Sequence, residues 1–238
     1  MVTAQAFIYI SDPAALNDDR VMSRTLEILS DDELKRFERL RFNEDQRAFA
    51  ASHGLVRQTL SRFAPVAPAD WAFINRKDGR PELADKFSKF QLRFNLSHSR
   101  GLVACIITVA MDCGVDVERF SKVKVPLNLA RRFFNEREYL HLLNLEGKEL
   151  DRRFIEIWTL KEAYVKAKGL GIRLGLSNFW FDIDDDLGVL AHVDPTEKSR
   201  KNMWHFSVSH ADKNHALGAA VANIKKQPVN FEIAQINL

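Results

Sequence analysis

The chain has 238 residues, of which 46% are hydrophobic and 28% charged, and its formal net charge is +3. This is an ordinary globular composition, and the length suits one large domain or two of about 110 residues each. The slight excess of basic residues suits an anionic ligand or an acidic partner and is too small to require nucleic acid. Cys105 and Cys113 form no CxxC pair and have no histidine cluster beside them, so neither a disulfide framework nor a zinc site is predicted.

The N-terminal stretch MVTAQAFIYISDP lacks the basic segment and the long apolar core of a signal peptide. No apolar run reaches the length of about 20 residues that a membrane-spanning helix needs. We therefore expect a soluble, cytoplasmic protein that does not bind a membrane.

The first half of the chain predicts a strand, two helices and then more strands. The apolar and β-branched run at 5–11 indicates a strand. A helix is expected within 29–42, where Ser30 and Glu33 have the spacing of a capping box. A second helix is expected over 43–63, because its apolar residues recur at helical spacing.

Strand patterns dominate the middle of the sequence. Residues 71–83 indicate a strand that runs into a turn, and three β-like runs follow at about 92–97, 102–110 and 114–118, with turn residues between them.

The second half predicts helices first and strands afterwards. One or two helices are expected over 126–143, and the strongest helical pattern of the chain starts at 151 and stops at Gly169. Four strand-like runs follow, at 179–184, 188–193, 203–210 and 215–222. The polar tail after Lys226 is expected to be loose.

The stretch FNLSHSRGLVACIIT (94–108) resembles FSVSHADKNHALGAAVA (206–222). Each has Phe-x-aliphatic-Ser-His, a turn and an apolar run. This pattern has two interpretations, a coincidence between two strand–turn–strand units or a duplicated α+β unit whose halves meet near residues 112–125.

The stretch GVDVERF (114–120) places Asp116 and Glu118 two residues apart. In a strand both carboxylates point to one face, while Val115 and Val117 face the core on the other side. Two negative groups at one spot repel each other unless a cation lies between them or open water screens them.

Glu162 and Lys166 are four residues apart, at the edge of the apolar stripe of the predicted helix after 151. They can form an ion pair on a solvated face, or they can be partly desolvated and bind a cation and a phosphate. Asp116, Glu118 and Glu162 together would offer three oxygen ligands, which suits Mg²⁺ shared with a phosphate.

His98 ends a predicted strand, with Asn95 and Ser97 beside it. These residues can simply cap a turn, or they can donate hydrogen bonds to a phosphate. Basic residues that could join them are Arg47, Arg76, Lys77 and Arg80. If these basic side chains surround a pocket, they could bind a polyphosphate. They would do so without a glycine-rich phosphate loop, because the sequence contains neither a Walker motif nor GxGxxG.

Four stretches, in this order and at this spacing, resemble a 4′-phosphopantetheinyl transferase of the surfactin-synthetase-activating (Sfp-like) type. They are FNLSHS (94–99), GVDVE (114–118), RRFFNEREY (131–139) and WTLKEAYVKAKGLG (158–171). With GRP (79–81) and EDQR (44–47), the resemblance covers nearly the whole chain and favours duplication over coincidence.

The resemblance implies an α+β fold of two similar halves in a pseudo-twofold arrangement, residues 1–112 and 113–238, with the metal ligands on the second half. It implies an enzyme that uses Mg²⁺ and takes coenzyme A as substrate. If the halves are duplicated, a monomer is expected, because one chain then supplies both faces of the pocket. The enzyme would transfer the 4′-phosphopantetheine group to a serine of an apo acyl, peptidyl or aryl carrier protein and release adenosine 3′,5′-bisphosphate.

The resemblance also implies a role for each matched residue. Asp116, Glu118 and Glu162 would hold the metal, and Glu162, or a water that it orients, would take the serine proton. Lys166 would bind the pyrophosphate and assist the departing phosphate. The other residues that would bind coenzyme A are Arg47, Arg80, Asn95, Ser97 and His98.

Some further positions of this chain match the family pattern less directly. Arg36 matches a position that is often basic near the adenine, whereas Glu33 stands where some relatives have lysine, and Lys161 is a candidate for phosphate contact. A carrier protein could dock on a basic and apolar patch, for which the sequence offers Arg131, Arg132, Phe133 and Phe134. The same two phenylalanines could instead belong to the core.

Two other functions fit part of this pattern. Three carboxylates and a lysine can cleave phosphodiesters with Mg²⁺, but the low net charge and the lack of a basic stripe argue against a nuclease. A non-catalytic module that binds coenzyme A or a carrier protein would not need the complete acidic set.

Overall fold

The structure is a computed structural model that describes residues 3–76, 79–121, 123–169, 171, 175–184, 188–193, 203–223 and 227–238. It contains two compact units. The N-terminal unit comprises residues 5–111 and 230–238, and the C-terminal unit comprises residues 1–4 and 112–229.

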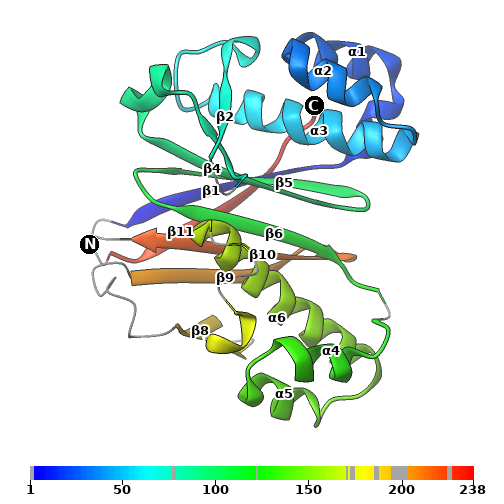
Figure 1. Ribbon diagram of the computed structural model, residues 1–238, viewed down its shortest axis with the longest axis vertical. Coiled ribbons are helices and arrows are strands. Elements are labelled where there is room, and N and C mark those ends of the chain that lie inside the picture. The colour runs from blue at the N-terminus through cyan, green and yellow to red at the C-terminus, as the bar shows by residue number, and fades with distance from the viewer. Residues whose placement is uncertain are drawn as a thin grey trace. The chain divides into compact units, whose positions relative to one another are not determined.

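The N-terminal unit is built on a four-stranded sheet in the order β11-β1-β5-β4 (Figure 1). Its strands are β1 (Ala4–Ser11), β4 (Leu92–Ser99), β5 (Leu102–Val109) and β11 (Val229–Gln235). The helix α3 (Asn43–Leu60) packs against β5 and β4, and its buried Leu55, Val56 and Leu60 form the core with the apolar face of the sheet.

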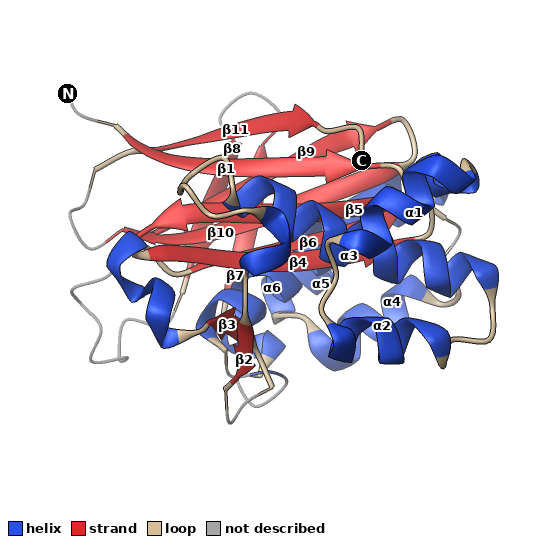
Figure 2. Ribbon diagram, turned by 90° about the horizontal axis from the view of Figure 1, so that it is seen from above, coloured by secondary structure: helices blue, strands red, loops and turns tan. Residues whose placement is uncertain are grey.

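Two shorter helices, α1 (Asp19–Glu27) and α2 (Asp31–Glu38), pack against α3 (Figure 2). The helix α2 starts at the predicted capping box, because the Ser30 backbone N–H donates to Glu33 at 2.8 Å and the Glu33 N–H donates to the Ser30 hydroxyl. The short strands β2 (Phe73–Asn75) and β3 (Pro81–Leu83) form a separate antiparallel pair.

The C-terminal unit has a three-stranded sheet in the order β6-β10-β9. Its strands are β6 (Cys113–Arg119), β9 (Met203–Asp212) and β10 (His215–Asn223), and β7 (Trp180–Asp184) pairs separately with β8 (Gly188–His192). The long helix α6 (Gly147–Lys168) lies on the sheet, and α4 (Pro126–Phe133) and α5 (Glu136–Leu142) pack beside it.

The two units repeat one topology. In each unit the first strand precedes the long helix and pairs with the second strand of a later hairpin. In the N-terminal unit β1 pairs with β5 of the hairpin β4–β5. In the C-terminal unit β6 pairs with β10 of the hairpin β9–β10. The two similar sequence stretches form these two hairpins. The predicted α+β fold of two similar halves is confirmed, and duplication accounts for the repeat better than coincidence.

Two elements differ from expectation. The sequence pattern did not indicate α1, and the prediction of a loose tail is wrong, because residues 229–235 form β11 beside β1. Within the described part of the chain, no helix is both long and apolar enough to cross a membrane.

Candidate functional site

Strand β6 presents Asp116 and Glu118 to helix α6. Gly114 lies on the same face, and a Cβ built there would collide with the Ala163 carbonyl oxygen, so α6 passes directly over this face. Val115 and Val117 point the other way and are fully buried, as the alternation predicts. Asp116 is only 5% exposed, so open water does not screen its carboxylate.

Helix α6 brings Lys166 into contact with this strand. The Lys166 ammonium lies 2.6 Å from Asp116 Oδ1 and donates to the Val115 carbonyl oxygen at 3.3 Å. Glu162, one helical turn earlier, is half-buried, as is Lys166. The two residues therefore lie at the edge of the buried stripe, as predicted, and Lys166 has a partner on the sheet rather than a fully solvated position.

The carboxyl groups of the cluster perturb one another. Burial, followed by the charge of Asp116, raises the pKa of Glu118 to about 7, and Glu162 adds to this rise. Burial and the charge of Asp116 also raise the pKa of Glu162, while Lys166 acts in the opposite direction on both groups. The cluster therefore carries more negative charge than the Lys166 ammonium compensates.

The donor chemistry of this cluster fits a hard divalent cation, because carboxylate oxygens are the ligands that Mg²⁺ prefers. Among the residues that the structure describes, no three acidic, histidine or cysteine side chains stand together as a ready metal-binding group. The cluster therefore has side chains of the type that binds Mg²⁺. In this structure the positive charge beside Asp116 is the Lys166 ammonium.

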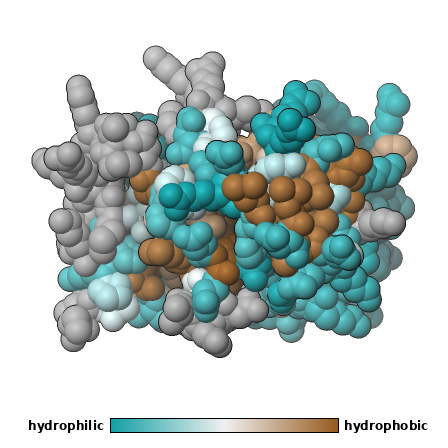
Figure 3. All heavy atoms as spheres, turned by 90° about the horizontal axis from the view of Figure 1, so that it is seen from below, coloured by the Kyte–Doolittle hydropathy of each residue, from teal (hydrophilic) through white to brown (hydrophobic). Residues whose placement is uncertain are grey.

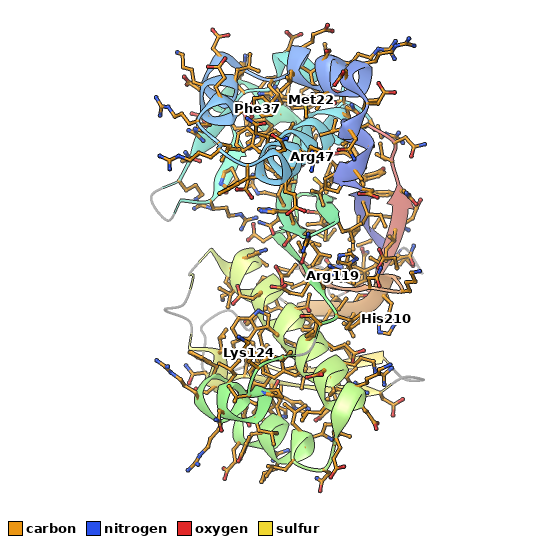
Figure 4. All side chains as sticks on the ribbon, turned by 90° about the vertical axis from the view of Figure 1, so that its right-hand side faces the viewer. Met22, Phe37, Arg47, Arg119, Lys124 and His210 are labelled. Atoms are coloured by element: carbon orange, nitrogen blue, oxygen red, sulfur yellow. The ribbon has the colours of Figure 1, made fainter. Side chains whose placement is uncertain are left out.

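The residues expected to bind coenzyme A lie in the N-terminal unit. Asn95 and Ser97 are buried on one face of β4. His98 is exposed, and because side chains alternate along a strand it points to the opposite face from Ser97. Arg47 on α3 (Figure 4) and Arg80 before β3 are half-buried, while the predicted basic neighbour Lys77 lies outside the described residues.

The structure corrects the expectation for Lys161 and explains the acidic residue at position 33. Lys161 does not contact phosphate, because it is fully buried and donates to the Leu176 and Phe179 carbonyl oxygens and to Glu138. Glu33, where some relatives have lysine, is buried between His53 and Arg57 of α3.

The pattern RRFF divides between surface and core. Phe134 is buried and stacks on Phe154, so this phenylalanine belongs to the core. Arg131 and Arg132 are exposed, and the Arg132 guanidinium lies over the half-buried Phe133 ring.

The site includes one group that sequence reasoning did not identify. Glu138 is 3% exposed and accepts hydrogen bonds from the Asn135 and Phe181 backbone N–H groups as well as the Lys161 ammonium. The spacing of Asn135 and Glu138 is that of a capping box, which was the available signal.

Comparison with known proteins identifies the family. The model of the "4'-phosphopantetheinyl transferase superfamily" matches residues 112–220, and that of "4'-phosphopantetheinyl transferase, N-terminal" matches residues 18–109. The 4′-phosphopantetheinyl transferase HetI of Nostoc sp. is 34% identical over 200 residues, which cover 84% of this chain and 81% of HetI. This chain belongs to the 4′-phosphopantetheinyl transferase family.

Other relatives agree with this assignment. The 4′-phosphopantetheinyl transferase Sfp of Bacillus subtilis is 27% identical over 179 residues, 75% of this chain and 76% of Sfp. The 4′-phosphopantetheinyl transferase gsp of Aneurinibacillus migulanus is 33% identical over 128 residues, 54% of this chain and 51% of that protein. The family predicted from the motifs is confirmed, and the phosphopantetheinyl transferase moves the phosphopantetheine group of coenzyme A to carrier proteins.

Proposed function

We propose that Asp116, Glu118, Glu162 and Lys166 form the catalytic centre of this transfer and that the three carboxylates hold Mg²⁺. One observation carries the proposal: Lys166 of α6 lies 2.6 Å from Asp116 of β6, so the helix and the strand that carry all four residues meet at this point. When bound, Mg²⁺ would neutralise charge on the pyrophosphate of coenzyme A.

The chain's own residues would then move one proton and stabilise one leaving group. The carrier serine oxygen attacks the phosphorus that bears the pantetheine arm, and the bond from that phosphorus to the bridging oxygen breaks. Glu162, or a water that it orients, takes the serine proton. Lys166 exchanges Asp116 for a pyrophosphate oxygen and stabilises the departing adenosine 3′,5′-bisphosphate.

The remaining contacts to coenzyme A would come from the N-terminal unit. The exposed His98 of β4 can donate a hydrogen bond to a phosphate oxygen, whereas Asn95 and Ser97 are buried on the opposite face of the strand and would contact a different part of coenzyme A. Arg47 and Arg80 would recognise the 3′-phosphate, because guanidinium groups bind phosphate through two parallel hydrogen bonds.

The carrier protein would dock on α4, α5 and the residues that flank these two helices. Val125, Leu140 and Leu143 are exposed here by 59%, 52% and 46%, and Figure 3 shows apolar atoms gathered on this face. Arg131 and Arg132 are exposed on α4 and would attract an acidic carrier. We further propose that the enzyme acts as a monomer in the cytoplasm, since one chain already contains both halves.

Incubation with coenzyme A, Mg²⁺ and an apo carrier protein, followed by intact-mass analysis, tests the function. The expected result is a carrier that gains one phosphopantetheine in the presence of the wild-type protein. Nicking of plasmid DNA in a parallel incubation with Mg²⁺, together with an unmodified carrier, would instead indicate a nuclease, and tight coenzyme A binding with neither reaction would indicate a binding module.

A further inference from the structure

Lys161 has no hydrogen-bonding capacity left for a substrate. Its ammonium lies 2.7 Å from the Leu176 carbonyl oxygen, 2.8 Å from the Phe179 carbonyl oxygen and 2.8 Å from Glu138 Oε2. An ammonium group has three N–H donors, and these three acceptors use all of them. The centroid of the Phe179 ring lies 4.4 Å from the same nitrogen, and the ring helps to exclude water.

Glu138 joins this lysine to two further elements. Its Oε2 atom also accepts from the Asn135 N–H at the start of α5, and its Oε1 atom accepts from the Phe181 N–H in β7. The buried ion pair of Lys161 and Glu138 therefore connects α6 to α5 and β7 with almost no contact with solvent.

The ion pair of Lys161 and Glu138 holds one side of α6, and the opposite side of the helix contacts Gly114 of β6. Lys161 directly precedes Glu162, so the directions of the two side chains are coupled through the helix. On the sheet side, Gly114 lets the backbone at Ala163 approach closely. At the outer radius of a helix, a rotation of 20° moves a side chain by about 2 Å. A shift of that size would disturb the strict geometry that Mg²⁺ requires.

We propose that Lys161 and Glu138 are positioning residues that set the rotation of α6, so that Glu162 points towards Asp116 and Glu118. The proposal rests on the proposed function, in which Glu162 is a metal ligand. Removing a buried ion pair as a whole is often neutral for stability, so a role in specifying geometry accounts for its presence better than a role in stability.

The decisive variant is the double substitution Lys161→Met with Glu138→Gln, which removes both charges from the core and avoids an isolated buried charge. Loss of a residue that orients a metal ligand weakens metal binding by about 10–100-fold. We expect Mn²⁺ binding, followed by electron paramagnetic resonance or calorimetry, to weaken to this extent. Binding of coenzyme A without metal should stay within about twofold of the wild type, since neither residue touches it.

Two further variants check the result. Glu138→Gln alone keeps an oxygen acceptor for Lys161 and should weaken Mn²⁺ binding less than the double variant does, although it should lower the free energy of unfolding because the Lys161 charge loses its counter-charge. Lys148→Met, at an exposed position on the first turn of α6, is the matched control and should behave as the wild type. Transfer by the double variant should recover when Mg²⁺ is raised.

Three outcomes would overturn the proposal. Unchanged Mn²⁺ binding in the double variant and in Glu138→Gln would show that the pair does not position Glu162. Weaker coenzyme A binding with unchanged Mn²⁺ binding would show that Lys161 acts on the substrate. A wild-type protein that binds no Mn²⁺ would fault the metal site itself, and the proposed function would fail together with this inference.

Discussion

Lys166 gives Asp116 the positive charge that its buried position requires, and it does so from a helix 50 residues further along the chain. The three carboxylates and this lysine could be named from the sequence, because their spacing placed two acids on one strand face and the other two residues on one helix edge. The contact between strand and helix could not be derived from spacing, because it depends on how α6 packs on the sheet.

Arg80 tests the recognition of the 3′-phosphate at the residue scale. Arg80→Ala should raise the KM for coenzyme A by about 10–100-fold, the worth of a charge-assisted hydrogen bond. The KM for 3′-dephospho-coenzyme A should hardly change, and Arg100→Ala, at an exposed position, is the control. Steady-state kinetics with both substrates measure this, and equal losses for the two would contradict the assignment.

Glu33 predicts a pH-dependent stability. Burial acts to raise its pKa, but hydrogen bonds from His53 and the Ser30 N–H and the charge of Arg57 outweigh it and lower the pKa to about 2. The carboxylate should therefore contribute about 3 kcal/mol to the free energy of unfolding above pH 4.5, and this contribution should be lost as the pH falls towards 2.

Denaturant unfolding of the wild type and of Glu33→Gln between pH 7 and pH 3 measures this contribution. The difference between the two free energies of unfolding should shrink as the pH falls, whereas the exposed Glu27→Gln should show no such trend. A difference that stays constant over this range would contradict the account. The Ser30–Glu33 capping box was predictable because it is local, but the partners on α3 depend on helix packing.

At the scale of elements, the closest approach in the site is that of α6 to β6. A methyl group in Gly114→Ala would meet the Ala163 carbonyl oxygen and the Ala167 nitrogen, both of which are backbone atoms that cannot rotate away. We expect the free energy of unfolding to fall by about 1–3 kcal/mol or more. Transfer should fall with it, because Glu162 and Lys166 would move away from β6.

Thermal unfolding and transfer assays of Gly114→Ala measure these effects, with Arg119→Ala at the exposed end of β6 as the control. A variant with wild-type stability and activity would show that α6 does not need this contact. The strands and long helices themselves were predictable from apolar periodicity. The short helix α1 was not, because only its Asp18 cap and a few apolar residues mark it.

At the scale of the whole molecule, the end of the chain returns to the N-terminal unit. Strand β11 lies beside β1, the Ile236 N–H donates to the Ile10 carbonyl oxygen at 2.9 Å, and Ile236 is buried in the core. The alternation of apolar and polar residues in 229–235 is a strand signal that the expectation of a loose tail passed over, whereas its pairing with β1, more than 200 residues away in the sequence, could not be read from that pattern.

Removal of residues 229–238 should therefore expose β1 as an edge strand and destabilise the N-terminal unit. Hydrogen exchange should show faster exchange in β1 and β5, while β6 and β10 of the other unit keep their protection. Ile236→Ser should have a similar but smaller effect, with the exposed Ile233→Ser as the matched control. Unchanged protection of β1 after the truncation would contradict this description.

The central claim is that Asp116, Glu118 and Glu162 bind a single divalent cation needed for transfer. Its most direct test is a Mn²⁺ titration of the wild type and of Glu118→Gln, with Glu149→Gln at an exposed position of α6 as the control. The account predicts one saturable site in the wild type and the control, and binding weakened by at least about tenfold in Glu118→Gln. Wild-type Mn²⁺ binding by Glu118→Gln would contradict it.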